Sequence, residues 1–319
     1  MDRSATFATK IRTAFAPCSL GQWPTPLEEQ PALARALGLG GLWLKREDLA
    51  GGNKIRGLEF LLTAAPPRSV VVTLGGEGSS HALATARAAR ARGHRTAVAL
   101  FAQPETEASR SVGVAIASSA DLVVRASSVL TLPWAVVRAW RAARRLGRRN
   151  PHWIPGGGAD PRAVIGHFLA TLELTTQLDA PPPPDTIVAP LGTGGTAAGI
   201  ALGVAWLGWP TRVVAVRVAP WLVANRWRTL RLARKAAALI RQAGLEFSVP
   251  RSSVRVDIVE GMGQGYGHPT PDGERARALA AQHGVRLDPT YGAKAFSIFL
   301  RRTTHDVRRA VFWDTFAWP

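Results

Sequence analysis

Cysteine, tyrosine and lysine are scarce in this sequence: one cysteine, two tyrosines and five lysines occur in 319 residues. The single cysteine, Cys18, excludes an internal disulfide and a cysteine-rich metal site, so we expect no bound metal and a reducing, cytoplasmic setting. The first residues lack the apolar stretch of a signal peptide, which agrees with that setting. With 46% apolar residues, the chain can bury the core of one large or two ordinary domains.

Acidic residues are also few: 22 Asp and Glu stand against 40 Lys and Arg, a net charge of +18. A basic nucleic-acid binder, with salt-sensitive association to DNA, is therefore one alternative. The arginines, however, are scattered through Ala-rich stretches such as AWRAARRLGRR, which is typical of solvated helix faces. The longest uncharged run, 186–211, contains six glycines and two prolines and does not resemble a membrane span. We expect neither a nucleic acid nor a membrane as partner.

Short Val-rich runs alternate with longer segments rich in Ala, Arg and Leu, the pattern of strands and covering helices in an α/β protein. Each intervening segment is long enough for the crossover that parallel strands require, so the sequence predicts wound parallel sheets, two for the whole chain. The expected strands are Ser69–Leu74, Thr96–Phe101, Asp121–Arg125, Thr186–Leu191, Arg212–Val218 and Val254–Val259. The expected helices are Ser80–Arg92, Leu132–Leu146, Pro161–Gln177, Thr196–Leu207, Asn225–Ala243 and Pro271–His283.

A glycine-rich loop directly follows the expected strand Thr186–Leu191 and precedes a helix. Its residues are Gly192, Thr193, Gly194, Gly195 and Thr196. Backbone N–H groups, hydroxyls and the positive end of a helix can bind a phosphate there, at the sheet edge where ligands of open α/β sheets bind. With Ala197 the loop also matches the dinucleotide fingerprint G-x-G-x-x-A. A dinucleotide-dependent oxidoreductase and a tight turn without ligand are therefore alternatives.

Lys54 follows two glycines in the sequence GGNK. A lysine that forms an imine must be neutral when it reacts, and burial in a cleft lowers its pKa towards that state. Because lysine is scarce in this chain, Lys54 is a candidate for such chemistry. The alternative is a solvated turn residue.

Ser79, Ser80 and His81 open the helix that follows the strand Ser69–Leu74. Helix capping explains one serine. Two serines with a histidine also suit a carboxylate cradle or a proton relay, whereas His81 alone is more typical of packing.

Both tyrosines, Tyr266 and Tyr291, lie in glycine-flanked loops. This is unusual for a ring whose ordinary role is packing in a core. We therefore include both among the candidate site residues.

Taken in order, these segments resemble the 1-aminocyclopropane-1-carboxylate deaminase/D-cysteine desulfhydrase family of pyridoxal-phosphate enzymes, which is tryptophan-synthase-β-like and of fold type II. The resemblance runs nearly end to end. It is carried by TPLEEQPALARALG, LWLKREDLAGGNKIRGLEFLL, VTLGGEGSSHALATARAARARG, WIPGGGADPRAVIGH, PLGTGGTAAG, GMGQGYGHPTPDGERARALA, LDPTYGAKAF and VFWDTF.

The resemblance implies pyridoxal 5′-phosphate as cofactor and a role for each matching residue. Lys54 matches the lysine that bonds to the cofactor and moves the substrate Cα proton. Ser79 matches a serine near the substrate carboxylate, and the two tyrosines match residues that assist proton transfer. The implied cofactor-binding residues are Asn53, Lys54, Ser80, Gly192, Thr193, Gly194, Gly195, Thr196 and Thr315. The implied substrate-binding residues are Ser79, Ser80, His81, Gly157, Tyr266 and Tyr291.

The family also implies a two-domain fold and a homodimer. The large cofactor-binding domain is expected at 1–53 and 166–319, and a smaller inserted domain at 54–165. Each is expected to be a wound open sheet.

Four departures from the family pattern lie near the expected cofactor site. Gly57 replaces a basic residue, Ser80 an asparagine, and Asp314–Ala317 the pattern His-Thr-Gly-Gly. Gly292 stands where true deaminases have a glutamate for the ring nitrogen, which argues against cyclopropane opening. Thr315 is the expected neutral partner of that nitrogen, and the glycine changes are expected to enlarge the pocket.

We therefore predict a lyase or deaminase that acts on a small amino acid by Cα deprotonation and β-elimination, as D-cysteine desulfhydrase does, with release of a 2-oxo acid and ammonia. The alternatives are a divergent member with a different or larger amino-acid substrate, and a non-catalytic protein that binds the cofactor.

Overall fold

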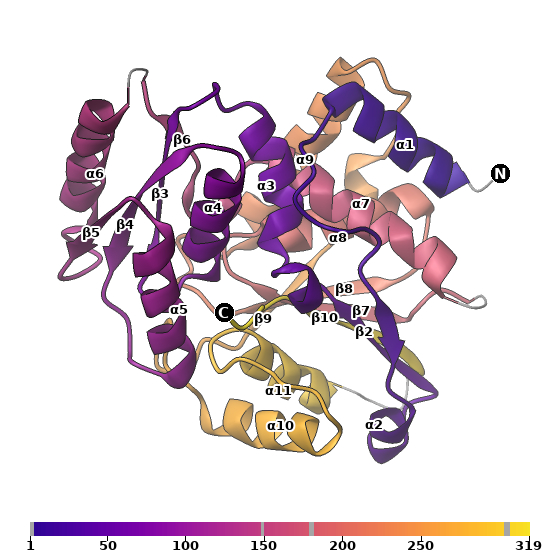
Figure 1. Ribbon diagram of the computed structural model, residues 1–319. Coiled ribbons are helices and arrows are strands. Elements are labelled where there is room, and N and C mark those ends of the chain that lie inside the picture. Colours follow the sequence, from indigo (N-terminus) through magenta and orange to yellow (C-terminus); the bar gives the residue numbers. More distant parts are fainter. Residues whose placement is uncertain (1–2, 148–149, 179–181, 303–306) are drawn as a thin grey trace.

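Two separate sheets organise the molecule, and the computed structural model describes residues 3–147, 150–178, 182–302 and 307–319. Figure 1 shows the small sheet on one side and the large sheet on the other, each covered by helices. The large sheet has the order β1 (Leu27–Glu29), β2 (Gly41–Arg46), β10 (Arg309–Asp314), β7 (Thr186–Leu191), β8 (Arg212–Arg217) and β9 (Asp257–Glu260). The small sheet has the order β5 (Leu122–Ala126), β4 (Arg95–Phe101), β3 (Val70–Gly76) and β6 (His152–Trp153). The expected α/β fold with two wound sheets is confirmed.

All strand pairs are parallel except β1 with β2. Strands such as β7, with the sequence TIVAPL, are buried along their whole length. This agrees with the near-continuous apolar character of strands that are covered on both faces.

The helices begin where capping residues allow. Ser79, Asp160 and Thr270 each accept a hydrogen bond from the first turn of the helix that follows. The helices are α1 (Arg3–Phe15), α2 (Pro31–Ala36), α3 (Lys54–Thr63), α4 (Ser80–Ala91), α5 (Glu107–Ser119), α6 (Leu132–Leu146), α7 (Pro161–Gln177), α8 (Gly195–Leu207), α9 (Arg226–Gln242), α10 (Pro271–Gln282) and α11 (Gly292–Arg302).

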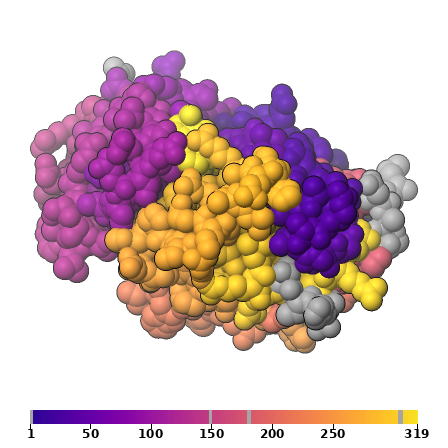
Figure 2. Space-filling model, turned by 90° about the horizontal axis from the view of Figure 1, so that it is seen from below, coloured from indigo at the N-terminus to yellow at the C-terminus, as the bar shows by residue number. Residues whose placement is uncertain are grey.

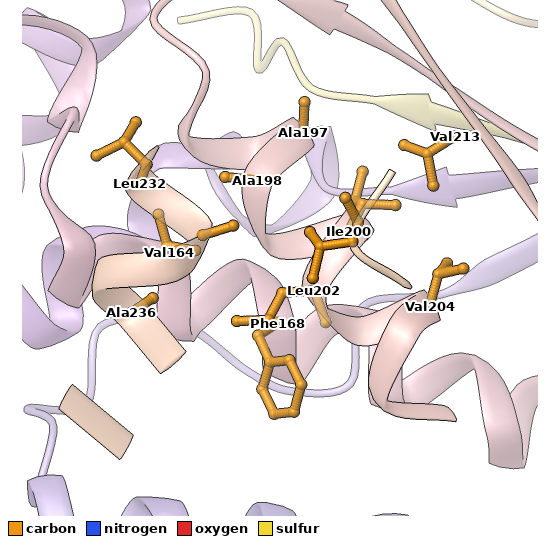
Figure 3. Packing of buried hydrophobic residues seen from close by; sticks show 14 of the residues in the cluster. Val164, Phe168, Ala197, Ala198, Ile200, Leu202, Val204, Val213, Leu232 and Ala236 are labelled. Atoms are coloured by element: carbon orange, nitrogen blue, oxygen red, sulfur yellow. The ribbon is translucent and has the colours of Figure 1, made fainter. Parts of the chain in front are cut away.

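Helices α7 and α8 lie at the centre of the largest apolar core. In Figure 3, Val164 and Phe168 of α7 pack beside Ile200 and Leu202 of α8. Gly199 permits this close approach, because a Cβ there would lie 2.3 Å from Cβ of His167. The packing fixes the first turn of α8, which carries part of the glycine-rich loop.

The carboxyl ends of four parallel strands converge on one region. Strand β7 leads into the glycine-rich loop, β3 into the start of α4, β2 towards Lys54, and β10 into Thr315. Residues far apart in sequence are thereby placed at one edge, where ligands of open α/β sheets bind.

One expected strand was placed wrongly. The segment expected as Val254–Val259 follows a single 3₁₀ turn at Arg251–Ser253, and β9 begins only at Asp257. Val254 and Val256 are buried in the core beside the turn, so their apolar character does not reflect strand pairing. The domain boundaries at 54 and 165 stay a prediction. Within the described ranges, no helix has the length and apolar character needed to cross a membrane.

Candidate active site

A cavity lies at this edge. None of the described residues that line it is acidic, and its only cation is Lys54. The lining residues are Asn53, Lys54, Ser80, Pro190, Gly192, Thr193, Gly194, Gly195, Thr196, Ala197, Tyr291 and Thr315. The structure thus brings together all nine residues expected to bind the cofactor.

The glycine-rich loop forms one wall of the cavity and is shaped for an anion. Gly194 has a φ of +94°, which side chains rarely adopt, and a Cβ there would lie 2.9 Å from the hydroxyl of Thr229. The helix α8 begins at the next residue, so its free N–H groups face the loop. The amide Nδ2 of Asn53 donates to the Thr196 hydroxyl at 2.7 Å and ties the loop to the lysine turn.

Lys54 is the first residue of α3 and faces the loop across the cavity. Its Nζ donates to the carbonyl of Gly157 at 3.2 Å, and burial lowers its pKa to about 8. At neutral pH an appreciable fraction of this amine is therefore uncharged and able to act as a nucleophile.

Two other lysines, Lys45 and Lys294, are fully buried and engaged elsewhere. Lys45 donates to Glu173 and Gln177, each at 2.7 Å. Lys294 donates to the carbonyls of Met262 and Gly265 at 2.7 and 3.0 Å. Lys54, which is partly buried, is the lysine whose amine faces the cavity.

Gly157 joins the lysine to the opposite wall. Its carbonyl accepts hydrogen bonds from Lys54 and, at 3.4 Å, from the hydroxyl of Thr193. Gly157 has a φ of +67°, and a Cβ would lie 2.5 Å from the Thr193 hydroxyl. The glycine is therefore required by the close approach of two loops, and its predicted contact with substrate stays a prediction.

The two serines of the predicted pair have different contacts. Ser79 is the N-cap of α4 and accepts from the N–H of Ala82 at 3.2 Å, whereas Ser80 lines the cavity. Capping thus accounts for Ser79. It is not among the residues that line the cavity, and its predicted place beside the substrate stays a prediction.

His81 lies behind Lys54 in a second, smaller space together with His167. Its Nε2 is 3.0 Å from the Thr73 hydroxyl, and burial lowers its pKa to about 3. Burial also holds the pKa of His167 well below its usual value. Both rings are neutral at physiological pH, so neither adds charge beside the lysine. His167 was not predicted from the sequence, because a single histidine among the apolar residues of α7 gives no signal.

The two tyrosines meet at their hydroxyl groups, 2.5 Å apart. Tyr291 lines the cavity, and Tyr266 supports it from the neighbouring loop. Burial raises the pKa of both phenols, so both stay protonated at neutral pH. The structure thus brings the two predicted tyrosines together, and their roles toward a substrate stay predictions.

Two of the departures from the family pattern have packing explanations. A Cβ at Gly57 would lie 2.7 Å from Cβ of Ala163, and a Cβ at Gly292 would lie 3.1 Å from a carboxylate oxygen of Asp288. Neither glycine lines the cavity between Lys54 and the loop 192–196, whereas Gly57 lines the smaller space beside Lys54, and the expected enlargement of the pocket stays a prediction. Thr315 does line the cavity, and its predicted role toward a ring nitrogen stays a prediction.

A buried ion-pair network beneath the lysine turn was not predicted. Arg56 is 1% exposed and contacts Glu47 at 2.6 Å and Glu173 at 2.7 Å. The pairing keeps the pKa of Glu173 low, against the effect of its burial. Because Glu173 lies 117 residues from Arg56, no local pattern could have revealed the contact. The network fixes the start of α3, and with it Lys54.

These features fit pyridoxal 5′-phosphate. The anion-binding loop suits its phosphate, and the partly neutral amine of Lys54 suits its aldehyde. Among the described residues, no group of three or more His, Cys, Asp or Glu is placed to hold a metal ion.

Comparisons with known proteins agree with the geometry. The family described as "Pyridoxal-phosphate dependent enzyme" matches residues 18–311. Nocardicin C-9′ epimerase from Nocardia uniformis subsp. tsuyamanensis is 36% identical over 85% of each chain. D-cysteine desulfhydrase from Klebsiella pneumoniae subsp. pneumoniae is 30% identical over 86% of this chain and 84% of the relative. A solved structure described as an ACC deaminase homologue superposes with a TM-score of 0.80 at 27% identity, over 96% of this chain and 94% of that one.

Proposed function

The chain belongs to the family of pyridoxal-phosphate dependent enzymes, and from this premise we propose that it is a lyase or deaminase of small amino acids with a β-leaving group. A D-cysteine-like substrate is the best single candidate, and a 2-oxo acid and ammonia are the expected products. The observation that carries the proposal is the cavity in which Lys54 faces the glycine-rich loop 192–196.

The chain's own residues suffice to hold the cofactor. The loop 192–196 and the first turn of α8 would hold the phosphate, and Lys54 would hold the aldehyde carbon. Asn53 keeps these two elements in register through Thr196. When bound, pyridoxal phosphate supplies an electron-accepting ring that stabilises negative charge at the substrate Cα.

Lys54 and Tyr291 are the proton-handling groups that line the cavity. With its pKa lowered to about 8, Lys54 can take the Cα proton at neutral pH. Tyr291, kept protonated by burial, can donate a proton to a leaving group. The pair therefore provides the base and the acid that β-elimination requires.

No carboxylate side chain lines the cavity, so the described residues offer no acid that would keep a ring nitrogen protonated. This favours elimination of a good leaving group over opening of a cyclopropane ring.

Epimerisation at Cα is a second candidate. A two-base epimerase needs two proton-transfer groups in one cavity, and Lys54 with Tyr291 meets that requirement. The relative that is 36% identical is named an epimerase. In this alternative the substrate keeps its amino group, and no ammonia is released.

Turnover in D₂O separates these reactions. The holoprotein is incubated with D- and L-cysteine, D- and L-serine and a wider panel, and ammonia, 2-oxo acid and Cα deuterium are measured. Elimination yields ammonia and 2-oxo acid in equal amounts. Epimerisation yields both enantiomers with deuterium at Cα and without ammonia.

Lys54→Ala provides the test of the site, with Lys235→Ala, an exposed lysine of α9, as the matched control. We expect Lys54→Ala to abolish turnover, with a loss of at least about 10³-fold, and the control to retain it. A protein that binds the cofactor through Lys54 but converts no amino acid would support the non-catalytic alternative and overturn the lyase.

We further propose that the protein is a cytoplasmic homodimer that binds neither nucleic acid nor membranes. Support for the dimer comes from Trp221, Leu222 and Trp227, which are 64%, 75% and 64% exposed around the start of α9. Exposed apolar clusters of this kind are typical of subunit interfaces. A reducing compartment is supported by the single, buried cysteine.

A further inference from the structure

The segment that follows β10 runs between the two sheets. Phe316 is 3% exposed and belongs to an apolar cluster formed otherwise by residues of α4, β4 and α5. In Figure 1 the chain end lies at the centre of the molecule, between α5 and the large sheet. In Figure 2, yellow atoms of this segment emerge between the magenta small-sheet region and the orange region around α10. A side chain from the segment after β10, a strand of the large sheet, thus completes an apolar cluster of the small-sheet region.

The same segment contacts the lysine turn. The carbonyl of Thr315 accepts a hydrogen bond from the N–H of Asn53 at 3.2 Å, directly before Lys54. A Cβ at Gly52 would lie 3.3 Å from that carbonyl, so the two backbones are in close contact.

Phe316 also contacts the tyrosine of the cavity. Its ring stacks on Tyr291 with centroids 6.5 Å apart and an interplanar angle of 25°. On its other side, Trp318 packs edge-on at 5.4 Å, and the guanidinium of Arg286 lies 3.8 Å above Trp318. Phe316 is therefore held in place independently of Tyr291.

Contacts with three residues hold Tyr291. A carboxylate oxygen of Asp288 accepts a hydrogen bond from its backbone N–H at 2.7 Å, which fixes the main chain. Tyr266 pairs with its hydroxyl and packs edge-on against its ring, with centroids 6.1 Å apart. Phe316 stacks on the ring, so the planes of the Phe316 and Tyr266 rings together set the plane of Tyr291 and where its hydroxyl points.

We propose that Phe316 is a positioning residue for Tyr291. Through this contact, Phe316 couples the packing of the small-sheet region to the orientation of the tyrosine hydroxyl in the cavity. The consequence for turnover rests on the proposed function, in which Tyr291 moves a proton. The positioning of the Tyr291 ring by Phe316 does not depend on the proposed function.

The chain's two tyrosines make this measurable, because phenolate absorbance reports only Tyr266 and Tyr291. The full chain is titrated with base, with and without pyridoxal phosphate, as wild type, Phe316→Ala and Phe316→Leu. Phe247→Leu is the control: Phe247 is also buried and stacked on aromatic rings, but in the large core. Leucine keeps most of the apolar volume and removes the flat ring. The Phe316→Leu variant therefore tests the proposal even if Phe316→Ala does not fold.

We expect phenolate to form at lower pH in both Phe316 variants, by about one pH unit or more, because water reaches the Tyr291 hydroxyl. The control is expected to titrate as wild type. With an identified substrate, kcat is expected to fall about tenfold in Phe316→Leu while KM changes less than threefold.

An unchanged titration of Phe316→Leu, or an equal shift in Phe247→Leu, would show that Phe316 is ordinary core packing. A shift specific to Phe316 in a protein without turnover on any substrate would support the positioning role and count against the proposed function alone.

Discussion

At the residue scale, the site depends on which lysine faces the cavity. Lys45 and Lys294 donate to several partners each, whereas Lys54 has a single hydrogen bond at 3.2 Å and faces a cavity. The glycine turn and the scarcity of lysine made Lys54 a candidate, and the family resemblance gave it its predicted role. The tasks of Lys45 and Lys294 could not be predicted, because their partners lie 128 and 32 residues away.

Loading of the cofactor should depend on pH through Lys54. Burial lowers its pKa to about 8, and only the neutral amine attacks an aldehyde. The rate at which the apoprotein takes up pyridoxal phosphate should therefore rise with pH, with a midpoint near 8, and level off above it. Stopped-flow absorbance measures this rate, and a midpoint near the ordinary lysine value of 10.5 would contradict the account.

Lys294→Met should loosen the loop that carries Tyr266. The variant removes two hydrogen bonds from an ammonium to the carbonyls of Met262 and Gly265. We expect a loss of about 1 to 3 kcal/mol in the free energy of unfolding. Urea denaturation measures it, and Lys235→Met, at an exposed position, should stay within about 0.5 kcal/mol of wild type. Equal values for the two variants would refute a structural role for Lys294.

At the element scale, the sequence predicted the Val-rich strands and Ala-rich helices well, and β7 and α7 lie at their expected bounds. It did not predict α1, α2, α3, α5 or α11. Helix α5 contains four serines and a glycine, and α11 begins at a glycine and buries a lysine. These two helices exist because their neighbours cover them, and local propensity does not report that.

Close packing of α7 against α8 makes a sharp prediction. A methyl group at Gly199 would lie 2.8 Å from backbone atoms of His167 and Phe168, so Gly199→Ala should cost about 1 to 3 kcal/mol of stability. Gly113 of α5 offers the control, since the nearest atom to a methyl there is 3.4 Å away. Gly113→Ala should be neutral or stabilising by up to about 1 kcal/mol. Comparable unfolding curves for the two variants would count against close packing of α7 on α8.

At the scale of the whole molecule, two sheets with separate cores are joined at one site. The joining contacts come from α3 packed on α7, from loops and from the segment after β10, and periodicity reveals neither the Arg56–Glu173 ion pair nor the loop contacts. Exposed ion pairs between the two regions, such as Arg286 with Glu107, lie at the surface and add little stability. The sequence therefore predicted the two sheets and the cavity-lining loops, but not the aromatic contacts that hold the halves together.

The proposed dimer is tested at the exposed tryptophans. A charge at the interface should be costly, so Trp227→Glu should shift the protein from dimer to monomer in sedimentation analysis. Trp134→Glu, at a position 68% exposed on α6, should leave the assembly unchanged. A monomeric wild type, or a dimer that survives Trp227→Glu, would refute this surface as the interface.

Mapping the covalent attachment of the cofactor tests the central claim most directly. The protein is incubated with pyridoxal phosphate, reduced with borohydride, digested and analysed by mass spectrometry. With five lysines in the chain, the assignment is unambiguous. The account predicts a pyridoxyl group on Lys54 alone. Attachment to Lys10, Lys45, Lys235 or Lys294 in its place, or no attachment at all, would contradict it.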